Sequence, residues 1–417
     1  MHFSRFGRKF QTSSGILQLM DDLGNALASD ERMLMLGGGN PSHIPKVQAL
    51  YRRRMKRILK HKGAFERMIG NYQSPQGEKE FVQALAALLR SQFGWEVGPE
   101  NIVLTNGSQT AFFILFNLFA GLDDRGVNKK ILFPLAPEYI GYSDIGLEKN
   151  FASAIRPQIE FLDQNFFKYH IDFKALSITE EIGAICVSRP TNPTGNVLTD
   201  SEIERLVSLA KKHELPLIID SAYGTPFPNI IYTEANPVFN QHTVVCMSLS
   251  KLGLPATRTG VVIANEELIR IISSANAVLS LSPSSVGAAL ALDLIKSGEI
   301  IKIGADLIRP FYRKKAGRAV RQLQKELRGV DFLIHKPEGA FFLWLWFRNL
   351  PVTSQMLYQR LKQRGVLVVS GHYFFPGLTE PWPHQHECIR VTYAQDERIV
   401  KAGLSIIAEE VKKAFHA

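Results

Sequence analysis

A lysine in the middle of the chain stands between hydroxyl side chains and an arginine, directly after a short apolar run. In the stretch VVCMSLSKLGLPATRTG, residues 244–260, Ser248 and Ser250 precede Lys251, and Arg258 follows it by seven positions. A lysine that is partly removed from water loses its proton more easily and can attack a carbonyl carbon to form a Schiff base. A serine hydroxyl and an arginine can both bind phosphate, arginine through two parallel hydrogen bonds. Most lysines are simply solvated, so the stretch predicts a phosphorylated carbonyl ligand only when other parts of the chain supply complementary groups.

Short runs of branched apolar residues alternate with longer amphipathic stretches between residues 101 and 264. Runs without polar interruption are typical of strands buried on both faces, and therefore of a mainly parallel sheet covered by helices in an α/β fold. In such sheets, ligands bind beyond the carboxyl ends of the strands. Thr199, with Glu202 three residues later, predicts the start of one covering helix. The predicted strands are 101–105, 130–134, 183–188, 215–220, 243–248 and 259–264.

Two of these strand ends lead into turns that could bind a ligand. After 101–105, the tripeptide Gly107-Ser108-Gln109 opens a helix-like run, where free backbone N–H groups attract phosphate. Many such turns only cap a helix. After 183–188, the turn RPTNPTGN holds Asn192 between two prolines, so that its amide could make a directed hydrogen bond. A plain Asn-Pro turn is the alternative.

Asp220 ends the run 215–220, and Tyr223 follows it by three positions. A carboxylate at the end of a buried strand is costly unless it is paired. A protonated pyridine nitrogen would be such a partner, and a helix cap or a structural salt bridge is the alternative. Four strand ends thus supply a lysine, an acid, an amide and a phosphate-binding turn, and this combination predicts one site for a phosphorylated aromatic cofactor.

The pattern of the sequence changes near residue 305. A long basic helix-like stretch at 306–328 leads to GAFFLWLWF, a shorter helix, two further apolar runs and a final helix at 396–415. This order indicates a second α+β unit. We therefore expect a large domain over 46–304 and a small domain made of 1–45 together with 305–417.

The apolar and charged residues indicate a soluble protein with small-molecule partners. The apolar stretch at 111–122 contains Asn117 and is too short for a membrane span. The net charge of +10 includes the run YRRRMKRILKHK at 51–62. That run could touch nucleic acid, but no nucleic-acid-binding motif accompanies it, so we interpret it as a solvated helix face.

The cysteines indicate a reducing compartment. Cys186, Cys246 and Cys388 are odd in number and have no metal-ligand spacing, so we expect no disulfide framework, no metal and a cytoplasmic location. The first twenty residues contain no acid and loosely resemble a transit peptide. A basic N-terminal arm of the mature protein is the interpretation that we adopt.

In this order, the groups resemble those of the fold-type I aminotransferases, which use pyridoxal 5′-phosphate (PLP). The motifs are NPTG at 192–195, D-x-x-Y at 220–223 and S-x-S-K-x₆-R at 248–258. The resemblance runs from GGGNP at 37–41 to CIRVTYA at 388–394. It implies a large domain with a mainly parallel sheet flanked by helices, and a smaller α+β domain.

Carried over residue by residue, the resemblance implies that Lys251 forms the Schiff base with the cofactor and later moves the Cα proton of the substrate. Asp220 would pair with the pyridine nitrogen. Asn192 and Tyr223 would hydrogen-bond the ring oxygen, so that Lys251, Asp220 and Tyr223 are the catalytic candidates. Tyr139 would stack on the ring, unless it is an ordinary core aromatic.

The resemblance also implies a substrate site and a phosphate site. Arg390 would bind the substrate α-carboxylate, beside the backbone of Gly39 and near Asn192. Because Arg390 lies within an apolar strand, it needs a carboxylate partner, either a substrate or an internal acid. Tyr72 would reach the phosphate of a partner subunit, which implies a homodimer with shared sites, unless it is an ordinary interface aromatic. In this chain the phosphate would be bound by Gly107, Ser108, Gln109, Ser248 and Arg258.

One motif departs from the pattern of many relatives, which have Pro-Gly-x-Arg after the lysine. Here the sequence is Pro-Ala-Thr-Arg at 255–258, so we expect Arg258 to keep its place in a loop of different shape. Within the superfamily, the chain is most similar to the bacterial valine–pyruvate aminotransferases, through passages such as SRPTNPTGNVLTD and SGHYFFPGL. That family exchanges the amino group between L-valine and pyruvate, giving 2-oxoisovalerate and L-alanine.

The residues alone support amino-group transfer on α-amino acids. Four alternatives stay open: another aliphatic or aromatic substrate, a PLP β-lyase or synthase reaction, an aminotransferase-like regulatory module, and an inactive structural relative. GGGNP begins at residue 37, which we expect to leave no room for a preceding DNA-binding domain. Lys251, Asp220 and Arg390 together argue against the inactive relative.

Overall fold

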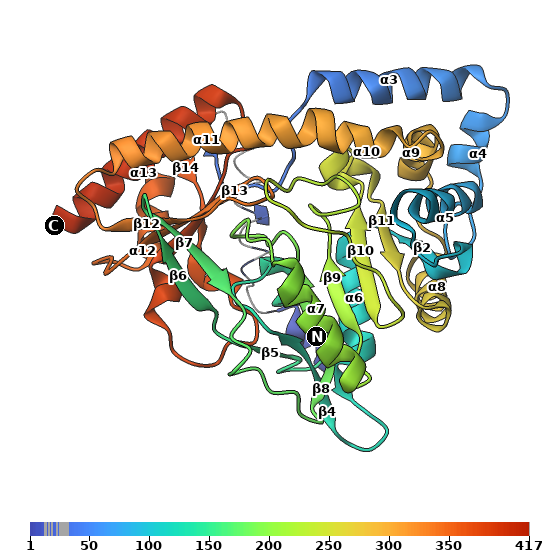
Figure 1. Cartoon of the computed structure of the whole chain (residues 1–417), viewed down its shortest axis with the longest axis horizontal. Helices are drawn as coiled ribbons and strands as arrows, with labels where there is room; N and C mark the ends of the chain where they lie inside the picture. The colour runs from blue at the N-terminus through green and yellow to red at the C-terminus, as the bar shows by residue number, and fades with distance from the viewer. Residues whose placement is uncertain (12–14, 16, 18–19, 22–23, 25–32, 417) are drawn as a thin grey trace.

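Two large β-sheets lie side by side in the computed structural model, each packed with helices (Figure 1). The structure describes every residue except 12–14, 16, 18–19, 22–23, 25–32 and 417. Within the described residues, no helix is both long enough and apolar enough to cross a membrane.

The larger sheet has eight strands and is mainly parallel, as the apolar runs predict. β10, β9, β8, β4 and β5 run parallel, whereas β11 is antiparallel to both β10 and β2, and β3 is antiparallel to β4. All six predicted strands are present. In sheet order the strands are β2 (Ile102–Thr105), β11 (Gly260–Ile263), β10 (Thr243–Ser248), β9 (Leu217–Asp220), β8 (Ile182–Ser188), β4 (Asn128–Phe133) and β3 (Gly121–Leu122), with β5 (Ala152–Ala154) beside β4.

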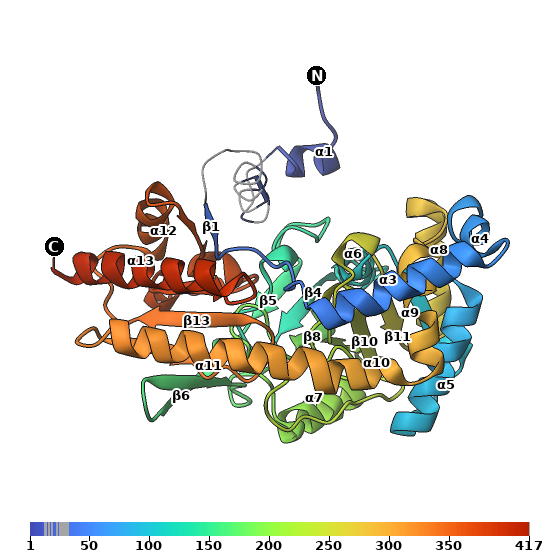
Figure 2. The same ribbon diagram turned by 90° about the horizontal axis from the view of Figure 1, so that it is seen from above.

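Helices cover both faces of this sheet, because its central strands are apolar on both sides. Figure 2 shows α7 (Asp200–Lys212) on one side and α6 (Ser108–Phe119) on the other. α7 begins with the predicted capping box, in which Glu202 N donates to Thr199 Oγ1 at 3.2 Å and Thr199 N donates to Glu202 Oε2 at 2.8 Å. The further helices of this unit are α3 (Pro45–Lys60), α4 (Ala64–Gly70), α5 (Lys79–Phe93), α8 (Glu266–Ser280) and α9 (Val286–Lys296).

The smaller sheet has six strands, and most of them come from the chain after residue 330. It also contains a hairpin from the middle of the chain, β6 (Gln158–Leu162) and β7 (Phe166–His170), which lies inside the expected range of the large domain. β7 pairs in parallel with β12. The sequence pattern does not predict this hairpin, because β6 is largely exposed and carries no buried apolar run. The other strands are β12 (Phe332–His335), β13 (Phe342–Phe347), β16 (Cys388–Thr392) and β15 (Val369–Ser370).

Two segments connect the halves of the molecule. β1 (Leu34–Met35) pairs in parallel with β14 (Val366–Leu367), so residues 34–35 lie against the C-terminal unit. A continuous helical stretch over 299–326 runs from one sheet to the other (Figure 2). It consists of α10 (Glu299–Lys302), the π-helical η5 (Ile303–Ile308) and α11 (Arg309–Glu326), and α13 (Glu397–His416) packs against α11 and α12 (Ser354–Gln363). A short helix, α1 (Arg5–Lys9), lies near the N-terminus.

Candidate active site

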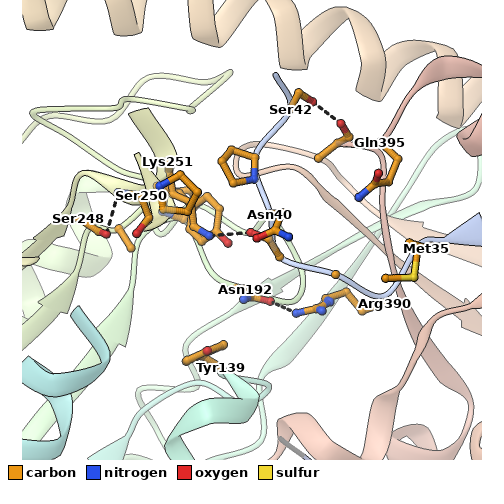
Figure 3. Close-up of a pocket in the computed structure, with 18 of the residues that line it drawn as sticks. Met35, Asn40, Ser42, Tyr139, Asn192, Ser248, Ser250, Lys251, Arg390 and Gln395 are labelled. Carbon is orange, nitrogen blue, oxygen red and sulfur yellow. Dashed lines mark hydrogen bonds between the residues drawn. The ribbon is translucent and has the colours of Figure 1, made fainter. Parts of the chain in front are cut away.

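The carboxyl ends of β8, β9 and β10 open into one cavity of about 1090 Å³, which β16 also lines. This volume is at the upper end of the range for ligand pockets and leaves room for a cofactor together with a small substrate. Figure 3 shows Ser248 and Lys251 on one side of the cavity and Arg390 on the other, with Asn192 and Tyr139 between them. The predicted residues that line it are Gly39, Ser108, Gln109, Tyr139, Asn192, Asp220, Tyr223, Ser248, Lys251, Arg258 and Arg390.

Lys251 lies in a single helical turn directly after β10. Its Nζ donates a hydrogen bond to the carbonyl oxygen of Gly39 at 2.8 Å. Burial, together with the positive charges of Arg390 and Arg258, lowers the pKa of Lys251 to about 8, although Asp220 acts in the opposite direction. An appreciable fraction of the amine is therefore neutral near neutral pH, as a nucleophilic or basic lysine requires.

Asp220 is the last residue of β9, and two donors hold its carboxylate. Ala222 N donates to Oδ1 at 2.8 Å, and the Tyr142 hydroxyl donates to Oδ2 at 2.6 Å. Burial raises the pKa of Asp220, whereas the hydrogen bonds and the charge of Lys251 act to lower it. Hydrogen bonds to the ionised form keep a carboxylate available as the partner of a cationic ring nitrogen.

Tyr142 is a residue of this site that the sequence analysis does not identify. Its ring is fully buried within aromatic neighbours, which restrict the movement of the hydroxyl away from Asp220. The only signal in the sequence is the second tyrosine of PEYIGY, three positions after Tyr139. The surrounding rings are Phe112, Phe116 and Phe133, with centroids 4.9, 5.1 and 5.7 Å away.

Tyr139 and Tyr223 contribute two aromatic walls. The ring of Tyr139 is half-buried and perpendicular to that of Tyr142, with centroids 5.3 Å apart. Tyr223 is buried, packs edge-on against Phe341 and lies with its ring centre 5.0 Å from the Nζ of Lys251. A flat ligand attached to this lysine would therefore lie among aromatic side chains.

The turn at Gly107 and the guanidinium of Arg258 form one corner of the site. Gly107 has φ +87°, and a Cβ there would lie 2.2 Å from Arg258 Nη2, so a side chain would displace the guanidinium. Arg258 Nη1 donates to the carbonyl oxygen of Pro255 at 3.2 Å, so the Pro-Ala-Thr-Arg loop folds back and brings the arginine to the start of α6. Ser248 is buried beside this corner, and its Oγ accepts a hydrogen bond from Ser250 N at 3.1 Å.

Arg390 lies in the middle of β16 with 2% of its surface exposed. Nη1 donates to Asn192 Oδ1 at 2.7 Å and Nη2 donates to the Gly37 carbonyl oxygen at 2.5 Å, while Nε is buried without a partner. Burial lowers the pKa of Arg390 to about 10, which leaves the group charged at neutral pH. In the described part of the chain no carboxylate contacts it, so a carboxylate ligand fits this arginine better than an internal acid does. The glycine beside it is Gly37, whereas Gly39 contacts Lys251.

Two predicted residues lie differently from the others. The side-chain amide of Gln109 donates to the Gly141 carbonyl oxygen at 3.1 Å, so it braces the turn that carries Tyr139 and Tyr142. Tyr72 is 81% exposed and does not line the cavity of its own chain. A contact between Tyr72 and a phosphate would therefore require a second subunit.

The residues present fit PLP. The corner at Gly107 and Arg258 suits a phosphate group at the N-terminus of a helix. Asp220, held by two donors, suits a protonated pyridine nitrogen, and Lys251 suits the aldehyde carbon.

Comparison with known proteins gives a consistent result. The chain is 51% identical over 415 residues to the valine–pyruvate aminotransferase of Escherichia coli (strain K12), covering 100% of this chain and 99% of that protein. The fold is similar to that of a putative amino-acid aminotransferase from Psychrobacter arcticum 273-4, with a TM-score of 0.97, 46% identity and coverage of 100% and 99%. It is also similar to the valine–pyruvate aminotransferase of Salmonella typhimurium LT2, with a TM-score of 0.89, 49% identity and coverage of 96% and 99%. Residues 52–406 match the family of class I and II aminotransferases, and the chain belongs to that family.

Proposed function

We propose that this chain transfers the amino group of L-valine to pyruvate, giving 2-oxoisovalerate and L-alanine by a PLP-dependent ping-pong mechanism. The observation that carries the proposal is that one cavity holds Lys251, whose pKa is lowered, together with the buried Arg390, whose Nε has no partner. The full-length identity of 51% to the valine–pyruvate aminotransferase of E. coli supports this pair of substrates.

The cofactor would be held by residues from several strand ends. When bound, PLP supplies an electron-accepting ring that stabilises negative charge at the Cα atom of the amino acid. We assign the covalent attachment to Lys251 and the ring nitrogen to Asp220. Asn192 and Tyr223 would donate hydrogen bonds to the ring oxygen, and Tyr139 would lie against the ring.

The phosphate would lie at the start of α6. The backbone of Gly107 and Ser108 offers N–H groups at a helix N-terminus, and Arg258 adds a charge beside them. Ser248 would add a hydroxyl. Gln109 would act through the Gly141 carbonyl oxygen that it already contacts.

Lys251 would move the proton in the central step. With cofactor and substrate bound, the amine of Lys251 would take the proton from the substrate Cα atom and later release it again. A pKa of about 8 suits this exchange, because a group that titrates near the working pH can both accept and release a proton. Asp220 would keep the proton on the ring nitrogen throughout.

Arg390 would bind the substrate carboxylate. A carboxylate oxygen at Nε would give this buried atom the acceptor that it lacks, and a second oxygen could approach an Nη edge. Because Asn192 and the Gly37 carbonyl already hold the two Nη atoms, the guanidinium plane is preset before the substrate arrives. The substrate would thus be held between Arg390 and Lys251.

Selection among aliphatic side chains should be modest. One methylene group changes binding in an apolar pocket by about 1–3 kcal/mol. We therefore expect turnover of several aliphatic amino acids, with valine among the better donors. Strict use of a single amino acid would count against this proposal.

A homodimer with shared sites is part of the proposal. Tyr72 is 81% exposed. Apolar side chains near it are also exposed, including Val278 at 87% and Leu281 at 58%. The two segments are neighbours, since Asn276 Nδ2 donates to the Pro75 carbonyl oxygen at 2.9 Å. A second copy that covered this surface would bury these groups and bring its own Tyr72 towards the phosphate corner. Sedimentation as a monomer at micromolar concentration would contradict this part of the proposal.

We also infer a large domain around the larger sheet, and a small domain that includes 305–417, the hairpin over 158–170 and the described residues of the expected range 1–45. The other residues of 1–45 lie outside the part of the chain that the structure describes. The pairing of β1 with β14 and of β7 with β12 supports this division. The three cysteines are buried and free, which supports a reducing compartment such as the cytoplasm.

The test is the absorption spectrum of the purified protein, recorded before and after L-valine and then pyruvate are added. We expect a visible band of lysine-bound cofactor that bleaches with valine and returns with pyruvate. A band that ignores valine but responds to another amino acid would refute the substrate pair and keep the reaction class. Release of ammonia or thiol from the substrate would instead identify the β-lyase alternative, and the absence of any band with added PLP would refute the role of Lys251.

A further inference from the structure

A second buried carboxyl group, that of Glu138, lies close to Asp220 behind the cavity. Glu138 belongs to the turn after β4 that also carries Tyr139 and Tyr142, and only 1% of its surface is exposed. The mechanism proposed above does not use it. Burying a carboxyl group without a cation is costly, so its role requires an explanation.

Both side-chain oxygens of Glu138 contact Ser188, at the end of β8. Ser188 N donates to Oε1 at 2.9 Å, and Ser188 Oγ lies 2.6 Å from Oε2. Ser188 lines the cavity and is the direct neighbour of Asp220 across β8 and β9. In addition, Glu138 N donates to the carbonyl oxygen of Phe374, whose ring lies 5.1 Å from the guanidinium of Arg390. Glu138 therefore ties the end of β8 to the walls of the site.

No cation contacts Glu138 within the described residues. The titratable groups that face it are Asp220 from β9, Cys186 from β8 and Tyr142 from its own turn. Burial raises the pKa of the Cys186 thiol and of the Tyr142 phenol well above their usual values, so both groups are neutral near pH 7. Asp220 is the remaining group that can carry a charge, and that charge is negative, as it is on an ionised Glu138.

The two carboxyl groups differ in what compensates them. Asp220 receives hydrogen bonds from Tyr142 and Ala222 and feels the positive charge of Lys251. Glu138 receives hydrogen bonds from the two groups of Ser188 and from Tyr139 N, but within the described residues no cation contacts it. When two carboxyl groups share a buried region, the proton settles on the one with less compensation. In agreement, burial raises the pKa of Glu138 to about 8, against the hydrogen bonds from Ser188 and from Tyr139 N.

We propose that Glu138 is a positioning residue that works as a neutral carboxylic acid, holding Ser188 in place and leaving Asp220 as the single negative charge against the cofactor ring. This inference rests on the proposed function, because it needs a ring nitrogen paired with Asp220. An ionised Glu138 would instead add a second negative charge beside Asp220 and compete for the same proton.

Two substitutions of Glu138 test whether its neutral form, rather than its ionised form, supports the site. Glu138→Gln keeps the shape of the protonated acid, since its carbonyl can accept from Ser188 N while its amide donates to Ser188 Oγ. We expect E138Q to bind PLP and turn over valine within about threefold of the wild type at pH 7, because no buried polar group loses its partner. Glu138→Ala leaves the groups of Ser188 without a partner, and we expect its PLP affinity to fall by about tenfold or more.

The pH dependence of the unfolding constant distinguishes a buried carboxylic acid that keeps its proton from a side chain with a merely structural role. Between the ordinary pKa of a glutamate and the value of about 8, the folded chain holds a proton on Glu138 that the unfolded chain has released. Stability therefore falls as pH rises through this window. The unfolding constant of the wild type, divided by that of E138Q, should rise between pH 5 and pH 8 by up to about tenfold per pH unit.

A matched control is Glu338→Gln, because Glu338 is also buried but forms an ion pair with Lys168. E338Q leaves the ammonium group of Lys168 without its counterion, so we expect it to be less stable than the wild type throughout pH 5–8. Urea unfolding of the three proteins, with and without PLP, supplies the measurement.

The outcomes are distinct. A wild-type to E138Q ratio that rises with pH, together with near-normal PLP binding by E138Q, supports the inference. A constant ratio, or an E138Q protein as impaired as E138A, overturns it while the wild type keeps its cofactor band and valine turnover. A wild type that shows neither band nor turnover would refute the proposed function instead, and with it the pairing of Asp220 that this inference needs.

Discussion

Replacing Tyr142 by phenylalanine removes one hydroxyl group from the site and keeps the ring that its aromatic neighbours enclose. In the wild type this hydroxyl donates to Asp220 Oδ2 at 2.6 Å in a fully buried environment. A hydrogen bond to a charged group contributes about 1.5–3 kcal/mol. Since about 1.4 kcal/mol corresponds to a factor of ten, we expect Y142F to bind PLP about 10- to 150-fold more weakly.

The loss of PLP affinity in Y142F should also depend on pH in a defined direction. Burial already raises the pKa of Asp220, and the Tyr142 hydrogen bond opposes that rise, so its removal raises the pKa further. The carboxylate must be ionised to pair with the ring nitrogen. Affinity for PLP should therefore begin to fall at a higher pH in Y142F than in the wild type as the solution is made more acidic.

The assay is a titration of the apoprotein with PLP, followed by cofactor absorbance or tryptophan fluorescence at a series of pH values. Tyr169→Phe is the matched control, because Tyr169 is also fully buried and its hydroxyl accepts from Trp344 Nε1 at 3.0 Å, but it does not line the cavity. We expect Y169F to lose stability without a change in the pH dependence of PLP binding. A Y142F protein that binds PLP within about twofold of the wild type over this range would refute the reasoning about Asp220.

Four further predictions follow from the site. Lys251→Ala should still bind PLP non-covalently, give no lysine-linked band and lose turnover by orders of magnitude; wild-type turnover would refute its role. In the wild type, the rate of covalent PLP uptake should rise with pH and level off above a pH of about 8, the pKa of Lys251. Arg390→Gln should move this plateau to a higher pH, because the charge of Arg390 lowers the pKa of Lys251. Arg390→Gln should also reduce kcat/KM for amino acids by about a hundredfold or more while leaving PLP bound, as two charge-assisted hydrogen bonds are lost; an unchanged kcat/KM would contradict the carboxylate assignment. Gly107→Ala should weaken PLP binding, because a Cβ would collide with the Arg258 guanidinium. An affinity equal to that of the wild type in an equilibrium titration would contradict the assignment of the phosphate to Gly107 and Arg258.

The central strands of the larger sheet could be predicted from the sequence because burial on both faces leaves uninterrupted apolar runs, as in Thr243–Ser248. The start of α7 could also be predicted, since Thr199 and Glu202 satisfy each other's backbone within four residues. The hairpin over 158–170 is different. Its partner strand begins at Phe332, so the information that makes it part of a sheet lies far away in the chain.

The same distinction applies to the site. Lys251, Asp220 and Asn192 could be placed together because each lies at the end of a predicted strand or within four residues after it, and parallel strands bring their carboxyl ends to one edge. The donor of Asp220 could not be found in this way. Tyr142 reaches Asp220 only because the turn after β4 folds over the end of β9, and PEYIGY offers two tyrosines with no local sign of which one meets the acid.

That turn concentrates three contacts in five residues and thereby couples them. Tyr139 faces the cavity, Tyr142 holds Asp220, and Glu138 holds Ser188, which is paired with Asp220 across the neighbouring strands. A displacement of the turn would therefore move an aromatic wall, a hydrogen-bond donor and the strand end next to Asp220 at the same time. Residues that share partners in this way do not contribute independently, so the electrostatic setting of Asp220 is a property of the turn as a whole and cannot be divided among its side chains.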